Sequence, residues 1–209
     1  MLQSENNKIT LCGCVKGEPK YNHEVFGEKF YSFTLLVKRL SGQFDELPVM
    51  LSERLIYDID IHDGKRICVE GQLRSYNIMV ENKSRLQIET FAREIFEYEG
   101  EDVNSITIDG FVCKTPVYRV TPFSREIADL LIAVNRAYGK SDYIPAICWG
   151  RNARFCQKIS VGEAIHIEGR LQSREYQKKL DDETVITRVA YEVSVSKFSV
   201  NKEEVDKAE

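Results

Sequence analysis

The sequence lacks most features that mark catalytic and membrane proteins. Its three histidines, His23, His62 and His166, are scattered without the spacing of metal ligands. No apolar run approaches the roughly 18 residues that cross a bilayer, and the Met1 end does not resemble a signal peptide. There is no phosphate-binding loop, His-Glu-x-x-His helix, nucleophile elbow or catalytic carboxylate pair. We expect a cytoplasmic protein that is not an enzyme, contacts no membrane and needs no cofactor.

Cysteine is present, but not in the arrangement of a disulfide-stabilised fold. The six cysteines are Cys12, Cys14, Cys68, Cys113, Cys148 and Cys156. They fall within apolar strand or helix patterns rather than at the loop spacings of a disulfide scaffold. The Cys-x-Cys pair near the start has no second pair to complete a zinc site. We therefore expect free, buried thiols and no structural metal.

Charge is unevenly distributed along the chain. The net charge is −4 overall, but it is −2 over residues 7–99, +3 over residues 104–200 and −2 over residues 201–209. Affinity for a polyanion follows the local cations that face its phosphates more than the total charge. The second half is therefore the better candidate for a nucleic-acid surface.

One two-faced segment occurs twice. In Ile165–Tyr176 apolar and polar residues alternate, so one face of a strand points into a core and the other carries cations. Residues 67–75 are an earlier copy. The residues that recur at an offset of 97 include Asn7, Gly13, Pro19, Arg39, Asp45 and Pro48, as Asn104, Gly110, Pro116, Arg136, Asp142 and Pro145. At an offset of 98 the matches include Gly64, Glu70, Gly71, Leu73 and Ser75, as Gly162, Glu168, Gly169, Leu171 and Ser173.

This repeat predicts two domains, residues 1–99 and 104–200, followed by a short acidic tail over 201–209. In the first unit we expect strands over 8–15, 30–39, 48–51, 67–75 and 86–96, a turn at 17–19 and a helix over 52–61. Five strands with a helix between the third and fourth is the order of an oligonucleotide/oligosaccharide-binding (OB) barrel. The predicted fold is therefore all-β, with two tandem five-stranded OB barrels.

Glycines support a tightly coiled barrel, because Gly13, Gly71, Gly110 and Gly169 fall in the middle of predicted strands, where a side chain would crowd the interior. The pattern alone leaves an SH3-like barrel open as an alternative.

The second unit carries an ordered set of motifs. They are Asn104-x-Ile-x-Ile-x-Gly110, Pro116, Leu131–Arg136, Asp142-Tyr-Ile-Pro145, Cys148-Trp-Gly150 with Ala153, and Val161-Gly162-x-x-Ile-x-Ile-Glu-Gly-Arg-Leu171. In this order and spacing the set resembles the DNA-binding domain of bacterial single-stranded DNA-binding proteins, from Asn104 to about Phe198. The first unit matches this family more loosely.

The resemblance implies binding of single-stranded DNA without strong sequence preference, in replication, repair or recombination, with RNA left open. Such binding needs aromatic rings that stack on bases, interleaved with cations that contact phosphates. The candidate binding residues are Trp149, Tyr176, Arg170, Arg174, Arg136, Arg151, Arg154, Phe155, Tyr118, Tyr138, Lys178, Lys38, Arg74 and Tyr76.

Several of these residues have competing interpretations. Trp149 alternates with Ile144, Ala146 and Cys148, which favours a surface position. Phe155 is better explained as the helix residue that closes the barrel than as a stacking ring. The first unit has Ser52 where the second has Trp149, so a scaffold role for that unit is as well supported as DNA binding.

Members of this family usually carry one barrel per chain and assemble as tetramers, so a homodimer of this two-barrel chain would supply four barrels. They also end in a long tail with an acidic tip finished by Pro-Phe, which recruits replication and repair proteins. The tail over 201–209 has no such tip, which leaves protein partners open. A competing hypothesis is an OB-fold assembly module of the primosome type that binds proteins rather than DNA.

Overall fold

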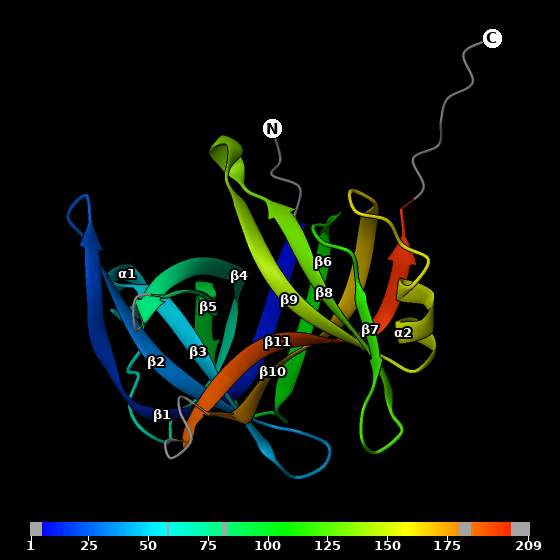
Figure 1. Cartoon of the computed structure of the whole chain (residues 1–209). Coiled ribbons are helices and arrows are strands. Elements are labelled where there is room, and N and C mark those ends of the chain that lie inside the picture. The colour runs from blue at the N-terminus through cyan, green and yellow to red at the C-terminus, as the bar shows by residue number, and fades with distance from the viewer. Residues whose placement is uncertain (1–5, 58, 81–82, 180–184, 202–209) are drawn as a thin grey trace.

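The computed structural model describes residues 6–57, 59–80, 83–179 and 185–201, and within them the chain is almost entirely β-structure (Figure 1). The side chains of two predicted binding residues, Tyr138 and Lys178, lie outside the described part. None of the helices within these ranges is long and apolar enough to cross a membrane.

The first barrel consists of β1 (Asn7–Val25), β2 (Glu28–Lys38), β3 (Phe44–Ser52), α1 (Glu53–Ile56), β4 (Arg66–Val80) and β5 (Lys83–Glu97). Antiparallel pairs join β2 to β1 and β3, and β4 to β1 and β5; a parallel pair between β3 and β5 closes the cylinder. The predicted OB order of five strands with a helix after the third is confirmed.

The second barrel repeats this plan with one break. Its elements are β6 (Val103–Val112), β7 (Val117–Val120), β8 (Glu126–Asn135), a 3-10 turn η1 (Ala137–Gly139), β9 (Ser141–Trp149), α2 (Arg151–Cys156), β10 (Ala164–Lys179) and β11 (Val185–Val200). β6 and β7 together correspond to β1, and the chain leaves the sheet between them, next to Pro116. Parallel pairing of β9 with β11 closes this barrel as in the first.

The alternation seen in the sequence places the core inside each barrel. Ile165, Ile167 and Leu171 are fully buried on one face of β10. In α2 the buried residues are Ala153 and Cys156, whereas Phe155 is 41% exposed. The expectation that Phe155 closes the barrel is therefore wrong, because the helix turns its two smaller side chains inward.

The predicted turn at residues 17–19 is also wrong. β1 continues to Val25, and its pairing with β2 shifts register between Lys16 and Lys20. Gly17 adopts a positive φ of 74° there and its N–H donates to the Asp63 carboxylate over 2.6 Å. The glycine and proline thus form a bulge that bends one long strand, which is a common use of these residues at barrel corners.

The glycines within the strands have the predicted role. A Cβ added at Gly71 or Gly169 would collide with the backbone carbonyl oxygen of Phe91 or Ser194, respectively, on the neighbouring strand. Both glycines lie where the long hairpin of their barrel shifts register. The missing side chains let each hairpin coil tightly enough to close its cylinder.

The two barrels are joined edge to edge, because β1 pairs antiparallel with β6 and so merges the eleven described strands into one continuous sheet (Figure 1). The Asn7 side chain donates to the Leu73 carbonyl over 2.7 Å and accepts the Leu73 N–H over 3.0 Å. Asn104 makes the same pair of bonds with Leu171 in the second barrel. The repeated asparagines therefore tie each first strand to its own hairpin beside the junction.

Two buried carboxylates bridge the barrels reciprocally. Asp45, 1% exposed, accepts hydrogen bonds from Arg39 of its own barrel and from Arg170 and the Ser173 N–H of the other. Asp142, fully buried, does the same with Arg136 of its own barrel and with Arg74 and the Ser75 N–H of the first. This exchange defines what we call the junction: the two aspartates, the four arginines that bond them, and Ser75 and Ser173.

The Asp142 charge is well compensated. Burial disfavours its ionised form, but hydrogen bonds from Arg136, the Ser75 N–H and Arg74 outweigh burial and hold its pKa below the ordinary value.

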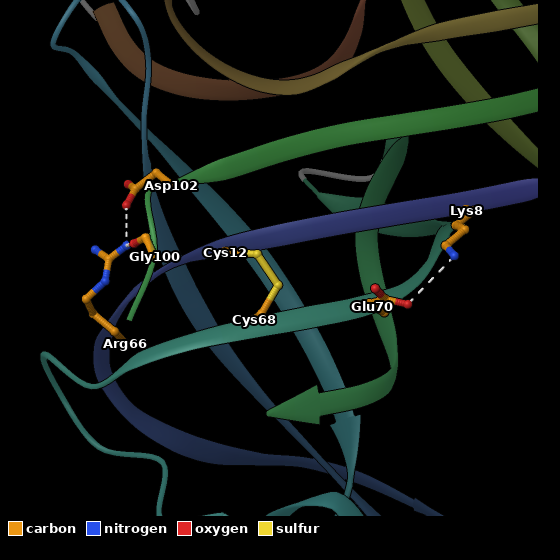
Figure 2. Close-up of a disulfide and its surroundings, with 7 residues drawn as sticks. All are labelled: Lys8, Cys12, Arg66, Cys68, Glu70, Gly100 and Asp102. Carbon is orange, nitrogen blue, oxygen red and sulfur yellow. Dashed lines mark hydrogen bonds and ion pairs between the residues drawn. A yellow bond between two sulfur atoms is a disulfide. The ribbon is translucent and has the colours of Figure 1, made fainter. Parts of the chain in front are cut away.

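The expectation of free thiols is wrong for Cys12 and Cys68, which form a disulfide between β1 and β4 (Figure 2). They are 56 residues apart in the chain, but strand pairing places them directly opposite each other with Cα atoms 4.0 Å apart. The other four cysteines are free. The register of the barrel, which the cysteine spacing does not reveal, brings this pair together.

We predict that Asp142→Asn destabilises the protein by roughly 2–4 kcal/mol, since it leaves two largely buried arginines without their counter-charge. Urea denaturation followed by circular dichroism measures this change. The matched control is Asp129→Asn, whose partner Arg119 is 50% exposed, and for which we expect about 0–1 kcal/mol. Equal effects of the two substitutions would contradict the role assigned to the junction.

We predict that iodoacetamide modifies four cysteines in protein that is denatured without reductant, and all six after reduction. Intact-protein mass spectrometry counts the added groups. Modification of six cysteines before reduction would show that the Cys12–Cys68 bond is absent.

Candidate nucleic-acid interface

Trp149 ends β9 and lies on the outer face of the second barrel. Ile144, Ala146 and Cys148 of the same strand are buried, whereas Trp149 is 37% exposed. Its indole N–H donates to the Ser194 hydroxyl on β11 over 3.3 Å, and its backbone pairs with Ile127 on β8. The polar edge of the ring is thus fixed to the barrel, and part of its surface remains open to a ligand.

Two more predicted residues of the second barrel converge on one carboxylate. The Tyr118 hydroxyl donates to Glu126 over 2.6 Å, and Arg154 approaches the other oxygen of Glu126 at 3.5 Å. The bond to Glu126 raises the pKa of Tyr118. The Gly150 N–H bonds the backbone of Glu126, which keeps this group next to the end of β9.

Phe155 and Arg151 extend this surface along α2. Phe155 packs edge-on against Phe198 with ring centroids 5.8 Å apart and keeps an exposed side. Arg151 is exposed, and no ion pair holds it within the part of the chain that the structure describes. The end of β9 and the exposed side of α2, which follows it directly, form what we call the Trp149 surface, composed of Trp149, Arg151, Arg154 and Phe155. Tyr118 pairs with the core residue Ala128, whereas Trp149 pairs with Ile127, so Tyr118 lies on the opposite face of the sheet.

Three other predicted cations, Arg74, Arg136 and Arg170, lie at the junction instead. Each binds a buried aspartate of the opposite barrel or, for Arg136, of its own. Burial lowers the pKa of both Arg74 and Arg170. These guanidinium groups hold the barrels together, and the structure separates them from the Trp149 surface.

An exchange of side chains accompanies these contacts. Gln72 and Arg74 occupy the positions that correspond to Arg170 and Gln172 in the other barrel. In each case the arginine also donates to the glutamine on its own strand, over 2.6 Å in the first barrel and 3.0 Å in the second. Arginine and glutamine have swapped places on the same strand face without loss of the bond to aspartate.

The remaining predicted residues are spread over the hairpins. Tyr176 accepts a hydrogen bond from Arg85 of the first barrel over 3.0 Å, and Arg174 lies over its ring with its guanidinium carbon 5.8 Å from the centroid. Lys38 is exposed at the end of β2, where its backbone N–H donates to Asp102. These residues do not join the Trp149 surface.

Tyr76 belongs to an aromatic groove that the sequence did not reveal. This groove of about 640 Å³ on the first barrel is lined by Asn22, His23, Met50, Arg74, Ser75, Tyr76, Glu89, Phe91, Arg93 and Arg136. Glu89, Phe91 and Arg93 were absent from the predicted set, although Glu89 and Phe91 alternate on the polar face of β5. The strand signal was present, but a phenylalanine within a strand is as easily a core residue.

Comparisons with known proteins show what each half of the chain resembles. A family model described as the single-strand binding protein family matches residues 103–200. The second barrel is therefore similar to that family. The curated relatives described below are named as single-stranded DNA-binding proteins.

Among curated relatives, the single-stranded DNA-binding protein of Clostridium tetani is 30% identical over 94 residues, which cover 42% of this chain and 65% of that protein. Single-stranded DNA-binding protein A of Bacillus subtilis is 28% identical over 97 residues, or 43% of this chain and 56% of that protein. The chain thus spans less than two thirds of the length of these relatives.

A solved structure matches the whole chain. The wild-type single-stranded DNA binding protein from Thermus aquaticus superposes with a TM-score of 0.75 at 20% identity, covering 97% of this chain and 96% of that one. At this identity the likeness shows a shared fold. It extends that fold to the first barrel, which the family model does not reach.

The groove also contains a titratable group whose protonation affects stability. Burial raises the pKa of Glu89 to about 7, although the Tyr76 hydroxyl bonds it over 3.2 Å and favours its charged form. In the unfolded chain the Glu89 carboxyl has a pKa of about 4.3. Between these values the folded protein holds a proton that the unfolded chain has released, so stability falls as pH rises through this window.

The free energy of unfolding of the wild type should therefore fall by about 1–3 kcal/mol between pH 5 and pH 8. We predict that Glu89→Gln removes this fall. Urea denaturation at both pH values measures it. Glu94→Gln, at an exposed position of the same strand, should leave the pH profile of the wild type unchanged. A Glu89→Gln profile that matches the wild type would show that Glu89 does not titrate in this window.

Proposed function

We propose that the chain binds single-stranded DNA without strong sequence preference through the Trp149 surface of the second barrel. The observation that carries the proposal is the position of Trp149: a partly open ring at the end of β9, within the residues that the model of the single-strand binding protein family matches. A base needs only an exposed ring face on which to stack, and every base offers one.

Cations beside Trp149 suit the phosphates that flank a stacked base. Arg151 and Arg154 project from α2 at the end of β9, and both are exposed. Phosphate contacts of this type release condensed counterions, so the affinity is expected to fall with salt. The positive net charge of residues 104–200 favours the same face, despite the negative charge of the whole chain.

The proposal includes a cytoplasmic role in replication, repair or recombination, with a homodimer that supplies four barrels. The two domains are taken as residues 1–99 and 104–200. Light scattering tests the assembly, for which we expect twice the chain mass of 24.1 kDa. Parallel titrations with RNA and with duplex DNA define the preference for single-stranded DNA.

We predict that oligo-dT quenches the fluorescence of Trp149, the single tryptophan, and that added salt weakens the interaction. In fluorescence anisotropy with labelled oligo-dT, Trp149→Ala should lose about fivefold or more in affinity, since stacking contributes about 1–3 kcal/mol per base. Trp149→Phe should retain most of the affinity, because it keeps a ring.

Tyr57→Ala is the control for this experiment, since Tyr57 is 82% exposed on the first barrel at the end of α1. It should bind like the wild type. If wild-type protein responds to neither single-stranded DNA nor RNA, the proposed function is wrong and a protein-assembly role takes its place.

A further inference from the structure

The first barrel carries an aromatic surface of its own, composed differently from the Trp149 surface. His23 and Phe30, on opposite strands of the β1–β2 hairpin, stack with ring centroids 5.0 Å apart and planes 12° apart. Phe30 lies 6.0 Å from Phe91 of β5, and the Arg93 guanidinium lies over the Phe91 ring at 5.7 Å. Three rings and one cation from three strands thus adjoin or line the groove of about 640 Å³.

Strand register shows how this surface relates to that of the second barrel. Trp149 pairs across the strands with Ile127, and the corresponding pair in the first barrel is Ser52 with Phe30. The bulky ring has moved to the partner strand of the same pair.

A second ring has been gained on β5. The carbonyl of Phe91 covers Gly71, as the carbonyl of Ser194 covers Gly169, so these two residues occupy equivalent positions. In the second barrel Ser194 accepts the indole N–H of Trp149. In the first barrel this position supplies a ring itself. The loss of tryptophan at residue 52 is therefore accompanied by rings at 30 and 91.

The rest of the groove is polar and mainly basic. Arg93 is exposed at its edge, and Arg74 and Arg136 line its side. Those two arginines bind Asp142, but each guanidinium carries five N–H donors and the aspartate uses only part of them. The amide of Asn22 and the Tyr76 and Glu89 side chains offer donors and acceptors to the edge of a base.

We infer that this groove is a second site for single-stranded DNA, in which an unpaired base stacks on Phe91 and a neighbouring phosphate meets Arg93. The inference rests on the proposed function and extends it to a barrel outside the family match. It assigns to Phe30 the role of supporting the Phe91 ring, whereas His23 stacks on Phe30 and lines the groove itself.

The test uses the full chain in a Trp149→Ala background, so that binding by the first barrel is measured without the Trp149 surface. Anisotropy with labelled oligo-dT should show residual binding. Adding Phe91→Ala, or Arg93→Glu at an exposed position that leaves the core intact, should lower this affinity by about fivefold or more. Circular dichroism and light scattering establish that each variant keeps its fold and assembly.

Phe96→Ala is the matched control, because Phe96 lies on the same strand, is 42% exposed and does not line the groove. It should leave the residual affinity unchanged. A thio-thymidine oligonucleotide provides a second readout, since irradiation should crosslink it to the peptide that contains Phe91 in the Trp149→Ala protein.

The outcomes separate the two proposals. If wild-type protein binds oligo-dT and Trp149→Ala weakens it, but Phe91→Ala and Arg93→Glu have no further effect and no crosslink forms near Phe91, the first-barrel site is refuted and the Trp149 surface stands. If the wild-type protein does not bind at all, the proposed function fails, and the inference with it.

Discussion

The arrangement of the two barrels depends on the antiparallel pairing of β1 with β6. That pairing sets the two barrels edge to edge and brings the hairpin of each within reach of the other. Only in this register can Asp45 and Asp142 be buried, because each needs donors from both barrels to offset the loss of water around its charge. The arginines of the junction are therefore needed to hold the two barrels together.

The arginines of the two barrels therefore fall into two groups according to what they contact. Those near the aspartates serve assembly, and those on α2, Arg151 and Arg154, are exposed at the surface. The aromatic rings also differ between the barrels. The second barrel presents a tryptophan at the end of β9, and the first presents phenylalanines on β2 and β5. Duplication has preserved the cylinder and altered the surface, as expected when packing constrains interior residues more tightly than exposed ones.

The fold was predictable because its signals are local and repeated. Alternation, mid-strand glycines and the order of strands recur at a fixed offset, and each constrains the backbone directly. The site was less predictable, because its residues depend on register between distant strands. Nothing in the spacing of Cys12 and Cys68, or of Arg74 and Asp142, indicates that they meet. Gly17 was interpreted as part of a turn because a bulge and a turn use the same residue types, and Phe91 was missed because an apolar strand residue carries no sign of its face.

The segment that connects β5 to β6 is only a few residues long, and it is fastened at both sides. Arg66 donates to the Gly100 carbonyl and to Asp102, each over 2.7 Å (Figure 2). The Lys38 N–H donates to Asp102 over 2.6 Å. Two barrels on separate chains would part on dilution, whereas a tether makes their association independent of protein concentration. A substitution in a symmetric dimer also appears twice, once in each subunit. In the fused chain it appears once, which leaves each barrel free to change without imposing the change on its neighbour.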